Sequence, residues 1–215
     1  GPGVQGLALG GAVLVSAREL TQRGGGYAEY QCAPAEALFR LPAGLSFVDA
    51  VSLPNVQLAL ALLQAGGGTA DVQAVLVTGA AGGVAAALTQ VARARGLRVV
   101  GTARTAARRE LALQQGCDAV LDPAEADLAE RIRTLTAGRG VDRAFDAIGG
   151  RTLIDALHAL APLGMLVSYN VVAGPPSEDV FQVLRELLGR SLAVRVFSMH
   201  TLDADRARRR ALMDE

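Results

Sequence analysis

The chain has 215 residues and carries 21 basic and 21 acidic side chains, so its formal net charge is zero. The basic residues are scattered along the sequence and not gathered on one face, so we expect no nucleic-acid partner. No uninterrupted apolar run reaches the roughly 18 residues of a membrane span. The first residues also lack the basic region and apolar core of a signal peptide, so we expect a cytoplasmic protein without a membrane partner.

The first 45 residues predict a β-rich module. Three stretches predict short strands joined by glycine and proline turns: GLALGGAVLVSA at 6–17, GGGYAEYQCA at 24–33 and ALFRLPAGLS at 37–46. The segment from Ser46 to Gln64, which contains Pro54, predicts a helical connector to the rest of the chain.

From about Gly66 onward, short apolar runs alternate with amphipathic stretches. The apolar runs predict six strands, at 74–78, 97–102, 119–121, 141–148, 164–169 and 192–197. Helical spacing between them predicts helices at 84–95, 106–115, 127–136, 153–160 and 180–189. Parallel neighbours need crossover connections, which helices supply, so the pattern predicts an α/β fold with a Rossmann-type, doubly wound parallel sheet of about six strands.

The most informative stretch is VLVTGAAGGVA at residues 75–85, where an apolar run passes through a glycine turn into a helical period. Glycines lack the Cβ that would keep a pyrophosphate away from the backbone, and the helix N-terminus offers free N–H groups and a partial positive charge. The G-x-G-x-x-G spacing falls on Ala80, Gly82 and Ala85, so the flanking strand and helix have to support the motif. We predict that four residues bind the pyrophosphate of a dinucleotide: Ala81, Gly82, Gly83 and Val84.

The end of the second predicted strand indicates which dinucleotide binds. NAD sites usually place a carboxylate about 20 residues past the glycines, where it accepts from the ribose hydroxyls, but residues 102–109 read TARTAARR. A guanidinium suits a 2′-phosphate because its N–H donors are paired. We therefore predict NADPH in preference to NADH, with Thr102, Arg104 and Arg108 in its site and Arg104 as the phosphate contact. The alternative for Arg108 and Arg109 is a solvated helix face.

The sequence predicts no metal site. Cys32, Cys117, His158 and His200 are isolated and do not have metal-ligand spacing. All 21 basic residues are arginine, so a mechanism that needs a lysine is excluded. The segment TGAAGGVA is also similar to the glycine turn of the short-chain dehydrogenases. That family needs a Tyr-x-x-x-Lys dyad, which a chain without lysine does not have.

Several segments follow one another in a familiar order: GPGVQGLALGGAVLV, GGYAEY, APAEALFRLPAGLSFVDAVSLP, VLVTGAAGGVA, GCDAVLD and GRGVDRAFDAIGG. From Gly1 to about Phe197 the chain resembles the medium-chain dehydrogenase/reductase superfamily, and within it the zinc-free quinone oxidoreductase branch, which includes enoyl reductases. The resemblance implies part of a GroES-like β-barrel catalytic domain at 1–54 and a Rossmann dinucleotide-binding domain at 55–215. It also implies that further strands of the barrel precede and follow the chain, which we expect to be part of a longer protein.

The same resemblance implies contacts to the nicotinamide after the fourth and fifth strands, at Ile148, Gly149, Tyr169 and Asn170. A half-buried core aromatic is the alternative for Tyr169. Residues 51–59 contain no cysteine at the place where zinc dehydrogenases carry a metal ligand. The resemblance further implies a homodimer through the sheet edge at 191–197, because an exposed apolar edge needs cover.

The activity implied is zinc-independent hydride transfer from NADPH to a quinone or to the activated C=C of an enone or enoyl substrate. Catalytic residues stay unassigned, since Tyr27 and Tyr30 are conceivable proton donors but barrel packing also accounts for them. The alternative is a non-catalytic NADPH-binding member of the family. It is kept because Gln57 and Ala59 stand where the family commonly has Gly and Thr, and because residues 10–13 read GGAV where GDRV is usual.

Overall fold

The chain forms two compact units, Gly1–Pro54 and Asn55–Glu215. The computed structural model describes residues 3–20 and 26–215. The assignment of the first unit to a GroES-like catalytic domain stays a prediction.

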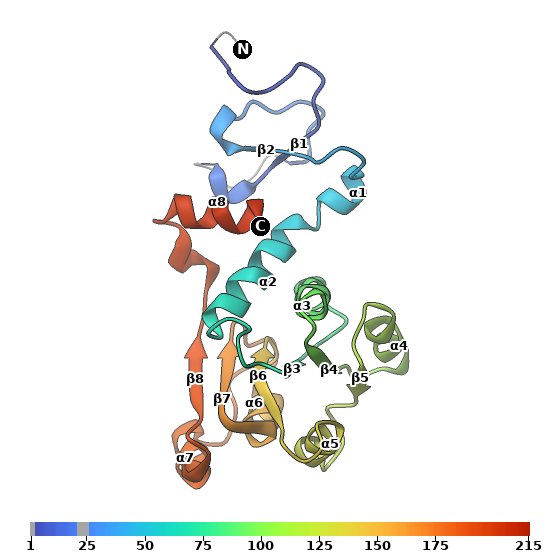
Figure 1. Cartoon of the computed structure of the whole chain (residues 1–215), viewed down its shortest axis with the longest axis vertical. Coiled ribbons are helices and arrows are strands. Elements are labelled where there is room, and N and C mark those ends of the chain that lie inside the picture. The colour runs from blue at the N-terminus through green and yellow to red at the C-terminus, as the bar shows by residue number, and fades with distance from the viewer. Residues whose placement is uncertain (1–2, 21–25) are drawn as a thin grey trace. The chain divides into compact units, whose positions relative to one another are not determined.

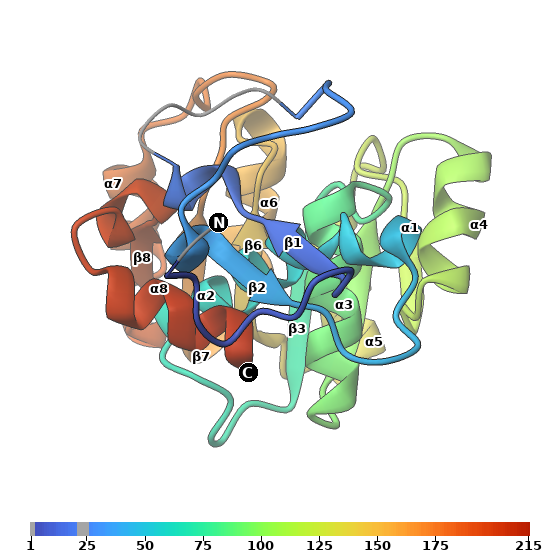
Figure 2. The same ribbon diagram turned by 90° about the horizontal axis from the view of Figure 1, so that it is seen from above.

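The first unit is built around one short pair of strands. Strand β1 (Val13–Val15) pairs antiparallel with β2 (Leu38–Arg40), so that Leu14 lies opposite Phe39 (Figure 2). Its described helices are η1 (Ala17–Glu19), η2 (Ala35–Ala37) and α1 (Phe47–Ala50), and the Ser46 hydroxyl caps α1 by accepting from the Asp49 N–H.

The strand predicted at 24–33 is absent from the part that the structure describes. Residues 24 and 25 lie outside the described residues, and residues 26–33 form no strand. Tyr27 and Tyr30 are fully or almost fully exposed. A strand needs a buried face, and residues 26–32 are all exposed.

The second unit contains a six-stranded parallel sheet in the order β5-β4-β3-β6-β7-β8. Its strands are β3 (Ala74–Val77), β4 (Arg98–Thr102), β5 (Ala119–Leu121), β6 (Val141–Asp146), β7 (Leu160–Ser168) and β8 (Ala193–Val196). The chain starts in the middle of the sheet, builds outward to β5, and then crosses back to β6 on the other side of β3. This is the doubly wound arrangement that the sequence predicts.

Helices cover both faces of this sheet. They are α2 (Leu53–Ala65), α3 (Gly83–Ala94), α4 (Ala106–Gln114), α5 (Leu128–Leu135), α6 (Gly150–Ala159) and α7 (Val180–Glu186). One core cluster joins α2, α3 and α4 to the sheet, and a second cluster joins α5, α6 and α7 to the opposite face. Figure 1 shows α3 on one side of the strands and α5 and α6 on the other.

The alternation of side chains along β3 explains the two clusters. Val75 and Val77 are buried in the cluster of α3, while Ala74 and Leu76 are buried in that of α5 and α6. A strand buried on both faces is a nearly continuous apolar run, and the run AVLV carries no polar residue.

The segment Phe47–Ala65 has the length and composition of a membrane-spanning helix, with a mean hydropathy of 1.3. The helix is broken between α1 and α2, and seven of the 13 residues of α2 are buried. The helix packs against α3 and the sheet on one side, and on the other against η4 (Met199–Leu202) and α8 (Arg206–Asp214). Core packing therefore accounts for its apolar sequence, and α2 is a core helix and not only the predicted connector.

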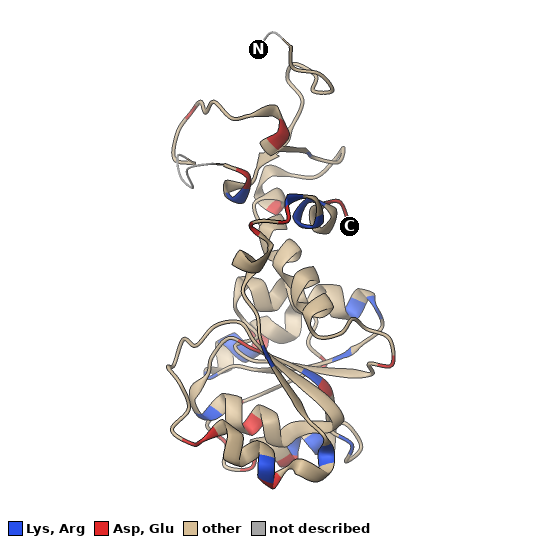
Figure 3. Ribbon diagram, turned by 90° about the vertical axis from the view of Figure 1, so that its left-hand side faces the viewer, with Lys and Arg blue, Asp and Glu red and all other residues tan. Residues whose placement is uncertain are grey.

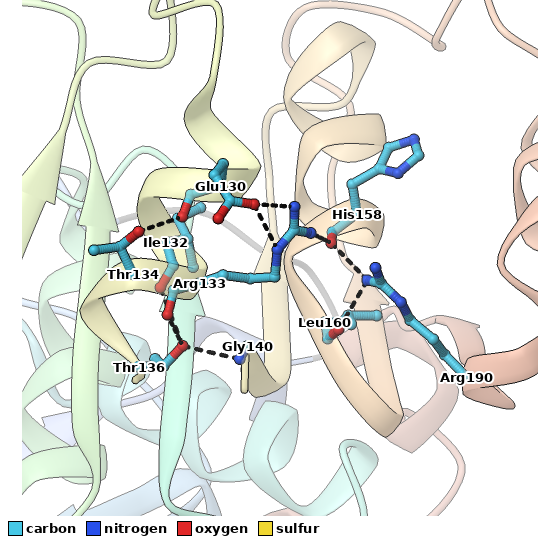
Figure 4. Close-up of polar contacts among 9 residues, drawn as sticks. All are labelled: Glu130, Ile132, Arg133, Thr134, Thr136, Gly140, His158, Leu160 and Arg190. Atoms are coloured by element: carbon cyan, nitrogen blue, oxygen red, sulfur yellow. Dashed lines mark hydrogen bonds and ion pairs between the residues drawn. The ribbon is translucent and has the colours of Figure 1, made fainter. Parts of the chain in front are cut away.

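Helix α6 runs directly into β7 at Leu160, so the fifth strand starts four residues before its predicted start. With no loop between them, the last carbonyls of α6 need partners from elsewhere. Arg133 Nη1 of α5 and Arg190 Nη1 of η3 (Leu188–Arg190) both donate to the carbonyl of His158, at 2.6 and 2.8 Å (Figure 4). The imidazole of His158 points away from both guanidinium groups in Figure 4.

A buried carboxylate, Asp142, holds the beginnings of β3 and β6 together. Its Oδ2 accepts from the N–H groups of Gln73 and Ala74, at 2.8 and 3.0 Å, and from the guanidinium of Arg139. Burial acts to raise the pKa of Asp142, but these donors outweigh it and the pKa is lowered.

Figure 3 shows acidic and basic residues interspersed over the helices of this unit.

Candidate cofactor-binding site

The glycine turn lies at the carboxyl end of the central strand β3. Val77, the last residue of this strand, stands opposite Gly101 on β4 and Phe145 on β6. The chain turns at Gly79, where φ is +62°, and the Gly82 N–H closes the turn by donating to the Gly79 carbonyl at 2.9 Å. Open α/β sheets bind ligands outside the carboxyl ends of the strands, where the strand order reverses, and this turn occupies that position.

Gly82 is the N-cap of α3 and has no side chain with which to cap it. The first N–H groups of a helix lack intrahelical acceptors, and Gly82 and Gly83 are both exposed. An exposed helix N-terminus without a side-chain cap suits an anion such as a pyrophosphate. Ala81 and Val84 flank these glycines in the sequence and are half-buried, and a contact of the four residues with a pyrophosphate stays a prediction.

Thr102 holds the glycine turn in place. It is buried at the end of β4, where its carbonyl accepts from the Ala80 N–H at 2.8 Å and its Oγ1 from the Gly79 N–H at 3.3 Å. The side chain of Thr102, which is predicted in the cofactor site, therefore accepts a hydrogen bond from the turn. A contact of Thr102 with the cofactor stays a prediction.

The turn packs closely onto β4 because Gly101 has no side chain. A Cβ at Gly101 would lie 2.7 Å from the Cβ of Ala80 and 3.0 Å from the Sγ of Cys117. Ala85, in the last position of the glycine motif, is buried in the core cluster below α3. Its methyl group lies in the helix-to-sheet packing, which is where the motif tolerates alanine.

Arg104 and Arg108 are both exposed, in the loop after β4 and in the first turn of α4. Arg109 behaves differently, since its Nη1 donates to Asp122 Oδ2 at 2.8 Å and to the carbonyls of Ala103 and Arg104. Arg109 thus fixes the loop that carries Arg104. The solvated helix face considered for Arg109 does not describe it.

Two buried polar residues, Thr78 and Asp146, meet at the carboxyl ends of β3 and β6. The Thr78 hydroxyl donates to Asp146 Oδ1 at 2.7 Å, and both residues are fully buried. Asp146 also accepts from the N–H groups of Ile148 and Gly149, at 3.2 and 2.8 Å. Burial raises the pKa of Asp146, and its hydrogen bonds only partly offset that effect.

The loop after β6 is tied to the loop after β7. The N–H groups of Val172 and Ala173 donate to the carbonyls of Ala147 and Ile148, at 3.1 and 2.7 Å. Gly149 is buried with φ +72°, and a Cβ there would lie 2.4 Å from the Gly174 carbonyl oxygen. Strand β6 ends at Asp146, two residues before its predicted end, because that carboxylate turns the chain.

Tyr169 is half-buried and packs against the core cluster of α2 and α3. Burial raises its pKa to about 12, with a smaller contribution from the nearby Asp146 carboxylate. Asn170 is exposed, and its Oδ1 accepts from the Val171 N–H at 2.8 Å. The hydrogen bonds between the two loops therefore hold Ile148, Gly149 and Asn170 at the carboxyl ends of the strands. The ring of Tyr169 instead packs partly against the core.

Sequence reasoning missed Thr78 and Asp146 as residues of this site. A usable signal was present, because each is a polar residue that follows directly on a buried apolar run, in VLVTG and AFDAIGG. Such residues lie at the carboxyl ends of parallel strands, and they need hydrogen-bond partners when they are buried. The described ranges 3–20 and 26–215 hold no cluster of three or more His, Cys, Asp or Glu side chains that could bind a metal.

Comparison with known proteins identifies the family. A family model described as zinc-binding dehydrogenase matches residues 83–214. The chain belongs to this family. Its similarities place it in the medium-chain dehydrogenase/reductase superfamily, in the zinc-free quinone oxidoreductase branch.

Two curated relatives and one solved structure illustrate the match. A 2-haloacrylate reductase from a Burkholderia species is 34% identical over 191 residues, which are 87% of this chain and 55% of that protein. A quinone oxidoreductase from Sus scrofa is 34% identical over 145 residues, 66% of this chain and 44% of that protein. The Escherichia coli quinone oxidoreductase complexed with NADPH superposes with a TM-score of 0.69 at 27% identity, covering 84% of this chain and 55% of that one. The chain thus spans about half the length of the relatives that it matches.

Proposed function

We propose that this chain provides the NADPH-binding part of a zinc-independent oxidoreductase, which transfers hydride to a quinone or to the activated C=C of an enone or enoyl substrate. The observation that carries the proposal is the exposed glycine turn at the carboxyl end of β3, with α3 left without a side-chain cap. The names of the relatives, quinone oxidoreductase and 2-haloacrylate reductase, support a reduction of this kind.

The residues of the turn fit a pyrophosphate. A Cβ at Gly83 would lie 3.0 Å from Asn55 Nδ2, and one at Gly82 would lie 3.3 Å from the Gly79 carbonyl oxygen, so side chains there would fill the space above the turn. With glycine at both positions, the N–H groups of the helix start can donate to phosphate oxygens.

When bound, NADPH supplies hydride from C4 of its nicotinamide ring. The protein's share of the work is to bind, orient and keep water away. In this proposal the loops after β6 and β7 receive the nicotinamide half, with Gly149 allowing close approach and the Asn170 amide pairing with a carboxamide. No proton donor is assigned.

A titration separates the enzyme from a protein that only binds. The full-length gene product is titrated with NADPH by fluorescence, and NADPH oxidation is then followed with 9,10-phenanthrenequinone and with a short enone. Turnover of either acceptor is expected. Binding without turnover would instead favour the non-catalytic alternative, which is supported by the buried methyl of Ala59, where the family commonly has a threonine hydroxyl.

The preference for NADPH over NADH is attributed to Arg104 and Arg108, which are both exposed after β4. Arg104→Glu should weaken NADPH by about tenfold to a hundredfold, as expected for lost hydrogen bonds between charged groups, and should leave NADH nearly unchanged. Arg98→Glu is the matched control, since Arg98 is exposed at the opposite end of the same strand. Equal losses for both cofactors would show that Arg104 does not read the phosphate.

We further propose a homodimer through the edge strand β8. Val196 is 83% exposed and Val194 is 37% exposed on this strand, and an apolar edge of this kind invites strand pairing. Val196→Asp should shift the full-length protein from dimer to monomer in light scattering. A wild-type protein that is monomeric at all concentrations would remove the proposal.

A further inference from the structure

We propose that Thr78 and Asp146 are a positioning pair that sets how tightly the nicotinamide half of the cofactor is held, separately from the adenosine half. The inference rests on the proposed function, because it concerns the same site. Neither residue faces the glycine turn as a donor for phosphate, and both are fully buried.

The pair fixes the backbone of the loop after β6. Asp146 Oδ1 accepts from the Thr78 hydroxyl and the Ile148 N–H, and Oδ2 accepts from the Gly149 N–H. The same Thr78 hydroxyl accepts from the Ala147 N–H at 3.1 Å. Three consecutive N–H groups, those of residues 147, 148 and 149, are therefore bound by two side chains from neighbouring strands.

This loop lies directly against the start of the glycine turn. A Cβ at Gly79 would lie 2.9 Å from Ile148 Cδ1, so the isoleucine side chain occupies the space that glycine leaves. Beyond it, the carbonyls of Ala147 and Ile148 accept from the N–H groups of the loop after β7. Because Asp146 fixes the loop after β6, it also helps to fix the loop after β7, which carries Asn170.

The glycine turn itself is held by a different residue. Thr102 on β4 accepts from the Gly79 N–H and the Ala80 N–H through its hydroxyl and its carbonyl. Two separate polar anchors therefore serve the two halves of the site. Thr102 anchors the turn for the pyrophosphate, and the Thr78–Asp146 pair anchors the loop proposed for the nicotinamide.

Asp146→Asn tests the pair without changing its shape. The Thr78 hydroxyl and the N–H groups of Ile148 and Gly149 all donate to the Asp146 carboxylate. The amide nitrogen of asparagine is itself a donor, so it would face at least one of these donors without an acceptor. Thr78→Val removes the hydroxyl at constant volume, whereas Thr78→Ser keeps it. Thr102→Val is the matched control, because it removes the side-chain acceptor of the other anchor.

The experiment measures dissociation constants by calorimetry in the full-length gene product, for NADPH and for adenosine 2′,5′-bisphosphate, which contains only the adenosine half. We expect Asp146→Asn and Thr78→Val to weaken NADPH about tenfold or more, the cost of an unpaired buried donor, with the bisphosphate changed less than about twofold. Thr78→Ser should behave like the wild type. Thr102→Val should weaken both ligands.

Hydrogen exchange of the amides at 147–149 supplies a second readout, and it should be faster in Thr78→Val than in Thr78→Ser. Equal losses for NADPH and the bisphosphate in both variants of the pair would overturn the proposal and leave a general structural role. Unchanged NADPH binding in Thr78→Val would overturn it as well, even if Asp146→Asn does not fold. A wild-type protein that binds neither ligand would instead overturn the proposed function.

Discussion

The two ends of the parallel sheet differ in how much of their backbone is left exposed. At the amino ends of β3, β6 and β7, side chains satisfy the backbone: Asp142 accepts from two N–H groups, and Arg133 and Arg190 donate to one carbonyl. At the carboxyl end of β3, Gly82 and Gly83 are exposed, and the α3 N-terminus has no side-chain cap. Side chains satisfy the backbone at the amino end, whereas the exposed glycine turn at the carboxyl end is the proposed site of a ligand.

This difference follows from where each polar group stands on the sheet. Charged residues at the amino end close the helix termini and strand starts, and their removal should cost stability alone. Buried polar residues at the carboxyl end hold loops in place, and their removal should change binding. The following substitutions test whether stability and binding separate between the two ends.

Gly149→Ala should have the largest effect, because it acts on both properties at the carboxyl end. The residue has φ +72°, and a Cβ would lie 2.4 Å from the Gly174 carbonyl oxygen. We expect a loss of about 3 kcal/mol or more of unfolding free energy from strain and overpacking, measured by urea denaturation, together with weaker NADPH binding. Gly174→Ala is the control for backbone strain without a clash, since Gly174 has φ +84° and a Cβ there meets nothing within 4 Å. Similar stability of the two variants would contradict the clash.

Asp142→Asn should lower the unfolding free energy by about 2–3 kcal/mol, the range for hydrogen bonds to a charged group, and should leave NADPH binding unchanged. Because the folded-state pKa of Asp142 is lowered, its ionised form stabilises the fold above the ordinary pKa of 3.8. That stabilisation is lost as the pH falls below this value. The wild type should therefore lose more stability than the variant on acidification below about pH 4. Parallel acid-unfolding curves would exclude this role.

Arg190→Ala should destabilise the fold by about 1 kcal/mol, because it removes a guanidinium from the carboxyl terminus of α6. Thermal unfolding measures the loss, and calorimetry with NADPH should detect no change in affinity. Arg185→Ala is the control, since Arg185 is exposed on the preceding helix α7. A change in NADPH affinity for Arg190→Ala would show that the two ends of the sheet are coupled.

Ala137→Gly should have the smallest effect, with the opposite sign. Ala137 follows α5 with φ +53°, and the Gly138 N–H donates to the Arg133 carbonyl at 2.8 Å, as in a glycine-terminated helix. Glycine should stabilise the fold by about 0.5–1 kcal/mol, since it adopts this conformation without steric cost. Ala129→Gly, inside α5, should instead destabilise by about 1 kcal/mol. A lower melting temperature for Ala137→Gly would contradict the assignment.

Much of the Rossmann unit could be predicted from local pattern. Six apolar runs and the helices between them lie close to their predicted ranges, because a strand buried on both faces has to be apolar throughout. The largest miss is at the start of β7, and α6 starts and α7 ends three residues earlier than predicted. Strand β6 ends early where Asp146 turns the chain, and β7 begins early because α6 runs into it without a loop.

The first unit was predicted less well, for a physical reason. Strands at 13–15 and 38–40 pair with each other, but the stretch between them forms none among its described residues. A β-rich composition gives each segment the propensity for a strand without giving it a partner, and pairing decides the outcome. The helical segment before Asn55 was recognised, but the burial of α2 in the core could not be derived from its length.

The candidate site divides in the same way. The glycine turn and the absence of a carboxylate after β4 are local features, so the sequence alone indicated a phosphate-binding element and its four residues. The contacts of Thr102, Arg109 and Asp146 depend on partners in distant segments of the chain, at Gly79, Asp122 and Thr78.

The sequence by itself determined the order of strands and helices and the position of the glycine turn. Only the tertiary structure decided that Thr78 meets Asp146, 68 positions away, and that Thr102 holds Gly79, 23 positions away. These contacts join the ends of neighbouring parallel strands, and they depend on strand order and register. A local pattern contains neither, because crossover connections can place a strand on either side of its predecessor.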